Sequence, residues 1–248
     1  MNKIVLDDLV DQIKEENYEL KKEKNQLIMR VFHDMECELE LSPSFPLWIE
    51  LESNIILKIK HFSNQKKGET NYHYVLKQNS SLQMNEFLTC KDVKENIVVD
   101  LIGEYACCDI SIRSIATTEE HYTIQVNHQA AHTKSNVEAR AVNFEEGNLH
   151  FHIEGIVPKD VIDCNVNQDT RIYTFNEKKC TIDPILLIEN NDVIANHAAF
   201  IGRFEEETLF YLMSRGIPRK LCNQLLIKGF LNKENDDEIS DIIHKYWG

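Results

Sequence analysis

The sequence contains few glycines and no glycine-rich loop of the kind that binds nucleotides. Its 248 residues include only eight Gly and five Pro, and the glycines form neither a Gly-x-Gly nor a Gly-x-x-x-x-Gly-Lys pattern. Backbone loops of that type cradle phosphates in nucleotide-binding proteins. We therefore expect that this chain binds no nucleotide, and that any ATP involved in its function is bound by another chain.

Positive charge is also scarce. Lys and Arg total 27 against 41 Asp and Glu, which gives a formal net charge of −14. A protein that binds a phosphate backbone or an anionic membrane needs a basic surface. In addition, no apolar run approaches the roughly 20 residues that span a bilayer. These absences argue against nucleic acid and against membranes as partners.

The cysteines lack any paired spacing. There are seven, an odd number, and no Cys-x-x-Cys occurs. The first residues run from Met1 into an acidic amphipathic stretch without the apolar core of a signal peptide. We expect free thiols in a cytoplasmic protein. Cys164 and Cys180 have polar and acidic neighbours, which makes them the better candidates for soft-metal ligands.

The apolar pattern divides the chain into three regions. Over residues 1–40 the apolar residues recur at helical spacing around a charge run, for example at Leu6, Leu9 and Ile13, and this predicts an N-terminal helical segment. Over 41–202 the period changes to two, in short runs rich in Thr, Val, Ile, Tyr and Phe, which predicts a β core. Over 203–248 the helical period returns in three segments, which predicts a helical tail.

Periodicity does not choose among all-β architectures. So many short strands must cover or close their edges, and a sandwich, a barrel and a β-helix all do so. A β-helix also allows a carbohydrate-active enzyme with carboxylates along a groove. The chain has no Gly-x-Ser-x-Gly elbow. Its His128-x-x-x-His132 lacks the glutamate of a zinc protease, so a strand-to-turn corner is the simpler interpretation. His150 and His152 share one strand face, where surface roles are the simpler interpretation.

Several motifs, in order along the chain, resemble one family. The segment from Glu189 to Gly202 reads ENNDVIANHAAFIG, and the block from Leu209 to Ile217 reads LFYLMSRGI. Upstream stand NHQAAHTKS from Asn127 and Gly155-Ile156-Val157, and QLLIKGFL follows from Gln224. Together these segments resemble the SufB/SufD family, the scaffold components of the SUF iron–sulfur cluster assembly system. The match covers about Leu101 to Leu231.

The resemblance implies a right-handed parallel β-helix core over 41–202, with helices before and after it. It also implies that two such chains pair through the last strands of the β-helix, and that the C-terminal helices dock the ABC-type ATPase SufC. The expected partners are a SufC-like ATPase, a SufB-like scaffold or a second copy of this chain, and apo iron–sulfur proteins. The expected cofactor is a transient iron–sulfur cluster shared with a partner chain.

Within the family the chain is closer to SufD. Where SufB carries Glu-His-Glu, this chain has Asn196-His197-Ala198, so the histidine is present and the second acid is not. The position of the SufB cluster cysteine falls on Asp169. The candidate cluster ligands or interface residues are therefore His197, Cys180 and Cys164. Glu189, Asn196 and His197 are the candidates for the dimer interface. The candidates for ATPase docking are Leu209, Phe210, Tyr211, Arg215 and Ile217.

These observations lead to one expected function and two alternatives. The expected function is a non-enzymatic scaffold and transducer of the ATPase stroke in cluster assembly. The first alternative is the β-helix carbohydrate enzyme. The second is a degenerate structural partner that recruits the ATPase without holding a cluster.

Overall fold

The computed structural model describes residues 2–6, 12–41, 46–63, 66–89, 91–232 and 237–247. The described elements are, in chain order, β1 (Asn2–Leu6), β2 (Gln12–Lys14), β3 (Tyr18–Glu23), β4 (Gln26–Val31), β5 (Met35–Leu41), β6 (Leu47–Leu51), β7 (Ile56–Ser63), β8 (Lys66–Leu76), β9 (Ser81–Leu88), β10 (Lys91–Leu101), β11 (Cys107–Ala116), β12 (Glu119–His128), β13 (Lys134–Asn143), β14 (Asn148–Val157), β15 (Cys164–Thr174), β16 (Thr181–Ile188), β17 (Val193–Gly202), α1 (Glu206–Ser214), α2 (Arg219–Leu231) and α3 (Asp237–Trp247).

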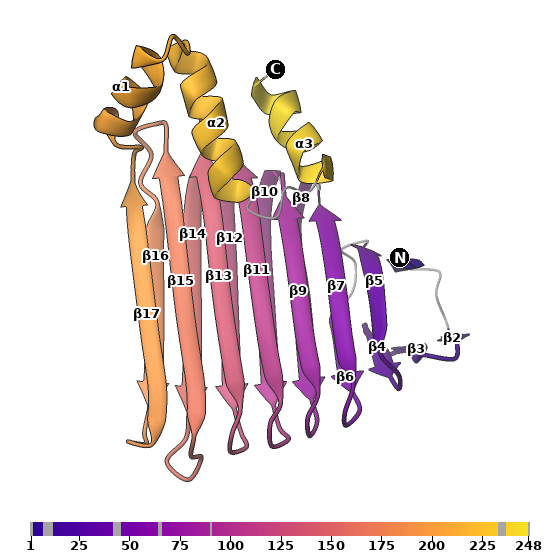
Figure 1. Cartoon of the computed structure of the whole chain (residues 1–248). Coiled ribbons are helices and arrows are strands. Elements are labelled where there is room, and N and C mark those ends of the chain that lie inside the picture. Colours follow the sequence, from indigo (N-terminus) through magenta and orange to yellow (C-terminus); the bar gives the residue numbers. More distant parts are fainter. Residues whose placement is uncertain are drawn as a thin grey trace.

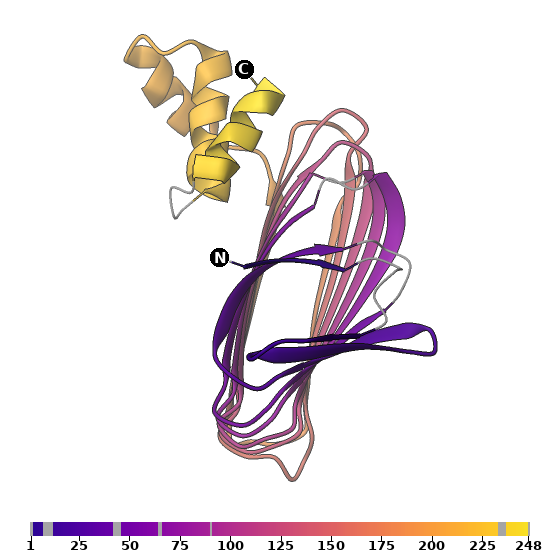
Figure 2. The same ribbon diagram turned by 90° about the vertical axis from the view of Figure 1, so that its right-hand side faces the viewer.

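The strands form two sheets that the chain visits alternately. One, here called sheet A, has the order β1-β5-β7-β9-β11-β13-β15-β17, and the other, sheet B, has the order β16-β14-β12-β10-β8-β6-β4-β3-β2. Strands β4 to β17 pair in parallel with the strand two positions away, so each sheet gains one strand per coil (Figure 1). The two sheets face each other across a narrow interior (Figure 2). The core is therefore a parallel β-helix, as the family resemblance implied, rather than a sandwich of antiparallel strands or a barrel.

Alternation of side chains fills the interior between the sheets. Each strand of the middle coils buries every second residue, as in the burial pattern of β14, where residues 149, 151, 153, 155 and 157 are buried. Tyr74, Tyr122 and Phe151 are the largest side chains that are almost completely buried. Tyr122 and Phe151 stack with ring centroids 4.9 Å apart because they are register partners on β12 and β14. Burying such aromatic surface stabilises the contact between neighbouring coils.

One corner of each coil is built from a residue with positive φ. These residues are Asn54, Asn79, Tyr105, His132 and Asp163, with φ between 54° and 64°. Each donates its backbone N–H to a carbonyl of the next coil, for example Asn79 to Glu104 at 2.9 Å. The side chains stack as well, since Tyr105 and His132 lie with parallel rings 4.7 Å apart. Asn and Asp tolerate this conformation better than most residues, so a chain with few glycines still turns these corners.

A group of acidic and polar side chains lies inside the β-helix near the apolar core. His61 Nδ1 and Glu86 Oε1 form a short contact, and Thr70 donates to Glu95 at 3.3 Å. Glu120 accepts hydrogen bonds from Tyr122 at 2.6 Å and from Ser114 at 2.9 Å. One carboxylate oxygen of each glutamate has no partner within the part of the chain that the structure describes. An ionised carboxylate is costly in such a place, so burial raises the pKa of Glu86 and of Glu120 to about 7.

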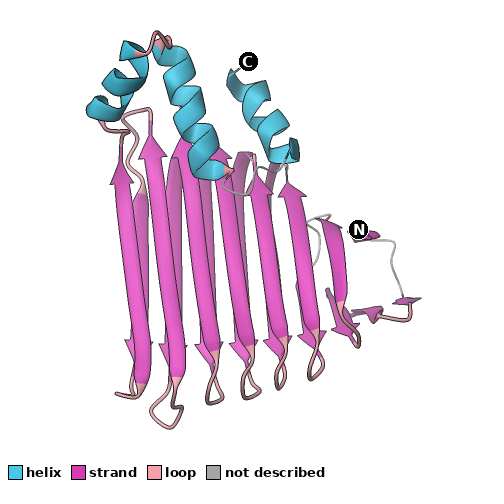
Figure 3. Ribbon diagram, in the orientation of Figure 1, coloured by secondary structure: helices cyan, strands magenta, loops and turns pink. Residues whose placement is uncertain are grey.

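The C-terminal helices cover one end of sheet A (Figures 2 and 3). Phe87, Ile115 and Val142, from three successive strands of that sheet, point outwards and are nonetheless buried. They pack against Ile227 and Leu231 of α2 and against Ile243 of α3. The helices are therefore fixed to several coils of the β-helix rather than only to its last coil.

The prediction of a helical segment over residues 1–40 is wrong. This region contains β1 to β5, and β2, β3 and β4 form an antiparallel meander that joins sheet B. The charged stretch from Glu15 to Lys24 contains β3 and the connection before it, and Lys24 (φ 54°) lies in the turn after β3. Leu27, Met29 and Val31 are buried in alternation, which is a period of two. Their burial against β6 outweighed the helical spacing. Leu9 lies outside the described residues.

The other expectations about secondary structure are confirmed. The period of two over 41–202 corresponds to strands β6 to β17, with β17 ending at Gly202. The predicted helical tail is confirmed as α1, α2 and α3. The cysteines that the structure describes are all free, and Cys90 lies outside the described residues. Among the described residues, no helix is both long enough and apolar enough to cross a membrane.

Two glycines provide a matched test of the packing between coils. A Cβ on Gly103 would lie 2.0 Å from the backbone nitrogen of Gln78, whereas a Cβ on Gly229, within α2, would meet nothing within 4 Å. We expect Gly103→Ala to lower the free energy of unfolding by about 1–3 kcal/mol or more, because backbone must move. Gly229→Ala should raise it by roughly 0.5–1 kcal/mol, because alanine favours a helix. Chemical denaturation of both variants measures the two effects, and equal effects of the two substitutions would contradict this account.

The buried glutamates predict how stability depends on pH. The pKa of Glu120 rises on folding from 4.5 to about 7, so the folded chain binds this proton more tightly than the unfolded chain. Its contribution is therefore fully present below pH 4.5 and is lost as the pH rises through about 7. Glu120→Gln, which keeps an acceptor for Tyr122 and Ser114, should remove this loss. The gain at pH 8 should be on the order of 2–3 kcal/mol.

Denaturant titrations at pH 5 and pH 8 measure the prediction for Glu120. Glu104→Gln serves as the control, because Glu104 is exposed at a corner of the β-helix. The prediction fails if Glu120→Gln destabilises the protein equally at both pH values.

Candidate functional site

The C-terminal end of the β-helix presents two long strand edges that pair with no further strand among the described residues. β17 is the last strand of sheet A and β16 is the last strand of sheet B, with 10 and 8 residues. Large apolar side chains are exposed on them, namely Leu187, Ile194, Phe200 and Ile201, with exposed fractions between 42 and 63%. Unpaired backbone groups beside exposed apolar side chains are typical of a surface that pairs with another chain. We call this surface, residues 181–202, the open end.

His197 lies at the middle of β17 and is exposed. Its register partner on β15 is Gln168, whose side chain is buried in the interior. Val193 and Ala195, four and two residues earlier on β17, pack against the interior cluster of Val157, Cys164 and Val166. By alternation, His197 belongs to the same inward row. It therefore lies at the end of the interior, in a position that a further coil would cover.

The structure does not bring the two predicted cysteine ligands to His197. Cys164 begins β15, in register with Val193, so it lies four residues, or about 13 Å, along the strand from the level of His197. It is buried, and its Sγ lies 3.2 Å from Thr133 Oγ1. Cys180 lies after the opposite end of β15 and accepts a hydrogen bond from Asn143 at 3.2 Å. Burial raises the pKa of the Cys180 thiol, which disfavours the thiolate that binds metals.

The two other predicted interface residues lie at the open end. Glu189 directly follows β16 and is exposed, and its backbone N–H donates to Val157 at 3.0 Å. Asn196 is exposed on the outer face of β17, next to His197 in sequence but on the opposite face of the strand. Both residues therefore lie at the edge strands. Among the described residues, no hydrogen bond joins their side chains.

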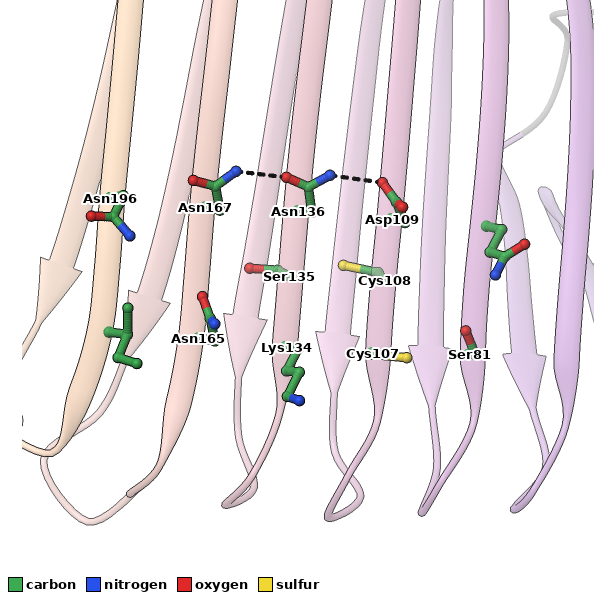
Figure 4. A pocket seen from close by; sticks show the side chains of 12 residues that line it. Ser81, Cys107, Cys108, Asp109, Lys134, Ser135, Asn136, Asn165, Asn167 and Asn196 are labelled. Atoms are coloured by element: carbon green, nitrogen blue, oxygen red, sulfur yellow. Dashed lines mark hydrogen bonds between the residues drawn. The ribbon is translucent and has the colours of Figure 1, made fainter. Parts of the chain in front are cut away.

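Asn196 belongs to a polar groove of about 560 Å³ across the outer face of sheet A (Figure 4). Asn167 donates to Asn136 at 2.7 Å, and Asn136 donates to Asp109 at 2.9 Å, so amides form a row that ends at β17. Asp109 is the only carboxylate among the described residues that line the groove. Glycoside hydrolysis requires a pair of carboxyl groups. The groove thus gives no support to the carbohydrate-enzyme alternative.

The predicted ATPase-docking residues lie on the hairpin of α1 and α2. Phe210 and Tyr211 are 73% and 57% exposed, whereas Leu209 is buried and secures α1. The guanidinium of Arg215 stands over the Tyr211 ring, 5.2 Å from its centroid. Ile217 is half-buried in the turn before α2. Met213, Leu221 and Leu225 add further exposed apolar surface to the hairpin.

An aromatic cluster connects this hairpin to the open end. The ring of Tyr173, on β15, lies 5.4 Å from that of Phe200 on β17 and 4.8 Å from that of Phe230 on α2. Phe204, in the linker between β17 and α1, lies 4.0 Å from Tyr173. The last strand, the linker and the second helix therefore meet at one side chain. Contacts within this cluster therefore join the open end to the hairpin.

Sequence analysis missed one group of possible ligands, Glu119, His121 and His150. They meet on the outer face of sheet B. In the sequence, His150 stands out only because it shares a strand face with His152. The signal was the spacing of 29 residues between His121 and His150, which places them in register on β12 and β14. A spacing of 29 residues indicates register partners only once the length of each coil is known.

Comparison with known proteins identifies the family. The family model described as "SUF system FeS cluster assembly, SufBD core domain" matches residues 53–230, which is well over half of the chain. This range contains the β-helix from β7 onwards, the open end, α1 and nearly all of α2.

Individual relatives agree with this assignment. The chain is 31% identical over 149 residues to the iron–sulfur cluster assembly protein SufD of Bacillus subtilis, which covers 60% of this chain and 34% of that protein. It is 45% identical over 51 residues to an iron–sulfur cluster assembly SufBD family protein of Mycobacterium bovis, covering 20% and 13%. A SufBD family protein of Staphylococcus saprophyticus is 28% identical over 110 residues, covering 42% and 23%. The chain thus spans about a third or less of these relatives.

The resemblance first seen in the Asn196-His197-Ala198 and LFYLMSRGI segments is therefore confirmed, and the match to SufD extends over more of the chain than the other two. This chain belongs to the SufB/SufD family of the SUF iron–sulfur cluster assembly system, and within that family it is closer to SufD.

Proposed function

We propose that this chain is a non-enzymatic, cytoplasmic scaffold subunit of a SUF-type assembly complex, and that it couples an ABC-type ATPase to a cluster-building interface. The observation that carries the proposal is the arrangement of two exposed apolar surfaces, the open end and the α1–α2 hairpin, on either side of the Tyr173 cluster. One surface suits a second scaffold chain, and the other suits the ATPase. The nucleotide chemistry belongs to the ATPase, since this chain has no phosphate-binding loop.

The open end supports pairing with a SufB-like chain or with a second copy of this chain. An added strand beside β17 would satisfy its unpaired backbone groups and cover Ile194 and Phe200. The same pairing would enclose His197 between two chains. An imidazole there can supply one neutral nitrogen ligand to iron, and the partner chain would supply the thiolates that clusters prefer. The cluster is then a transient cargo that apo iron–sulfur proteins receive.

The hairpin supports docking of the ATPase. Aromatic side chains with high exposure, beside an arginine, are the residue types that dominate protein interfaces. Leu209 is buried and α1 contacts α2, so Phe210 and Tyr211 are exposed on a helix that packs against its neighbour. Arg215 and Ile217 follow in the turn, where they extend the same surface.

Substitution of the exposed aromatics tests the docking surface. We expect the double substitution Phe210→Ala, Tyr211→Ala to weaken binding of the SufC-type ATPase at least 100-fold, because interface aromatics of this kind cost about 2 kcal/mol or more each. Co-purification after co-expression and isothermal titration calorimetry measure the affinity. Ile162→Ala is the matched control, since Ile162 is 45% exposed but lies in the turn before β15, at the opposite end of that strand from the hairpin. Unchanged affinity of the double variant would contradict the proposed docking surface.

Substitution of His197 tests the cluster-building interface. We expect His197→Ala to leave folding and ATPase binding unchanged, because the side chain is exposed and remote from the hairpin. Maturation of an apo iron–sulfur protein by the complete complex should fall at least tenfold, since one ligand or interface group is lost. His33→Ala, at an exposed histidine between β4 and β5, is the control. Wild-type maturation by His197→Ala would favour a structural partner that recruits the ATPase without holding a cluster.

A further inference from the structure

Three potential metal ligands converge on the outer face of sheet B, on strands β12 and β14, next to β16 of the open end. His121 on β12 and His150 on β14 are register partners, and Glu119 precedes His121 by two residues on the same strand face. The candidate ligand atoms of all three lie within 4.8 Å of one another. Among the residues that the structure describes, this is the only group of three or more His, Cys, Asp or Glu side chains that meets this geometry.

The distances are close to those of a metal site. Glu119 Oε1 lies 2.9 Å from His121 Nε2, and the two imidazole rings lie nearly parallel with centroids 4.4 Å apart. Zinc binds imidazole nitrogen at about 2.0–2.1 Å and carboxylate oxygen at about 2.0–2.2 Å. Ligand atoms of one ion are then about 3–4 Å apart. Small rotations of exposed side chains are enough to bring this group from its present spacing to such a geometry.

A second contact orients His150. Its Nδ1 lies 2.9 Å from the hydroxyl of Thr181 on β16, the next strand of the sheet. A hydrogen bond at one ring nitrogen fixes the ring and leaves the other nitrogen for a metal, which is the usual arrangement around metal-binding histidines. The threonine therefore acts as a positioning residue for the group.

The charges around the group also suit a cation. Glu119 contributes one negative charge, and Asp183 on β16 adds negative potential at His150. Lys94, the register partner of His121 on β10, lies 3.7 Å from Glu69 and is thus paired with an acid on the far side.

We propose that Glu119, His121 and His150 bind a divalent first-row transition metal ion, with two imidazole nitrogens and one carboxylate as ligands and with solvent at the remaining positions. Two histidines and one carboxylate with open positions are a ligand set used for ferrous iron and for catalytic zinc. The site does not depend on the proposed assembly function, because its three ligands lie outside the open end and the hairpin, and only the orienting residue Thr181 belongs to the open end. It can therefore stand even if that function fails.

Metal titration of the tag-free, chelator-treated full chain tests the site. Isothermal titration calorimetry with Zn²⁺, and with Fe²⁺ under anaerobic conditions, should show one equivalent bound with a Kd in the micromolar range or below. His121→Ala and His150→Ala should each weaken that binding at least tenfold, and Glu119→Gln should weaken it less. Thr181→Val should reduce affinity while leaving the stoichiometry at one, because it removes only the orienting hydrogen bond.

His152→Ala is the matched control, because His152 lies two residues from His150 on the same strand face but outside the group. Circular dichroism of each variant verifies folding, and Co²⁺ absorption spectra give a second readout of nitrogen ligation. Binding of one ion that survives the double substitution His121→Ala, His150→Ala would overturn the proposal, since the thiols or other histidines would then hold the metal. Equal loss in His152→Ala, or no binding of either ion, would overturn it as well.

Discussion

Each coil of the β-helix forms its backbone hydrogen bonds with the coil before it and the coil after it, and every other feature depends on the register of this stacking. The register places Gln168 beside His197, His121 beside His150, and the amides of Asn136 and Asn167 in one row. The corner residues with positive φ reinforce it, since each donates its N–H to the next coil. A slip of one residue would turn every interior side chain to the outside, so the candidate sites exist only as long as the register holds.

The same stacking explains why buried glutamates are tolerated. Glu86, Glu95 and Glu120 lie in the interior at positions where alternation would favour apolar residues. Neighbouring coils supply the imidazole of His61 to Glu86 and the hydroxyl of Thr70 to Glu95. Glu120 accepts instead from Tyr122 and Ser114 of its own coil. The remaining cost appears as raised pKa values. A β-helix has few alternative places for an inward side chain, so a polar residue at such a position stays buried.

The sequence predicts part of this structure, and particular residues show where prediction stops. The period of two over the core and the helical tail follow directly from the apolar pattern, whereas the choice of a β-helix came from the motifs around His197 and Arg215. The N-terminal region misled because Leu20, Leu27 and Val31 fit a helical spacing, while Leu27, Met29 and Val31 also alternate, and packing on β6 decided between the two. The ligand group was beyond reach because coil lengths differ: register partners are 25 residues apart at Asn71 and Asn96, and 31 apart at Ser135 and Val166. The family resemblance assigns His197 to the last strands of the β-helix, but its separation from Cys164 and Cys180 required the strand register.

The attachment of the helices has a mechanical consequence. α2 packs on Phe87, Ile115 and Val142, which belong to three different strands of sheet A, while α1 is joined to the end of β17 by the three residues 203–205. A force on the hairpin therefore divides between two paths. Through the packing of α2, the force acts on several strands, whose hydrogen bonds must break together. Through residues 203–205, it acts on the edge strand β17 alone, whose hydrogen bonds can break one after another. The hairpin is thus attached both to the packed face of sheet A and, through three residues, to the strand that carries His197.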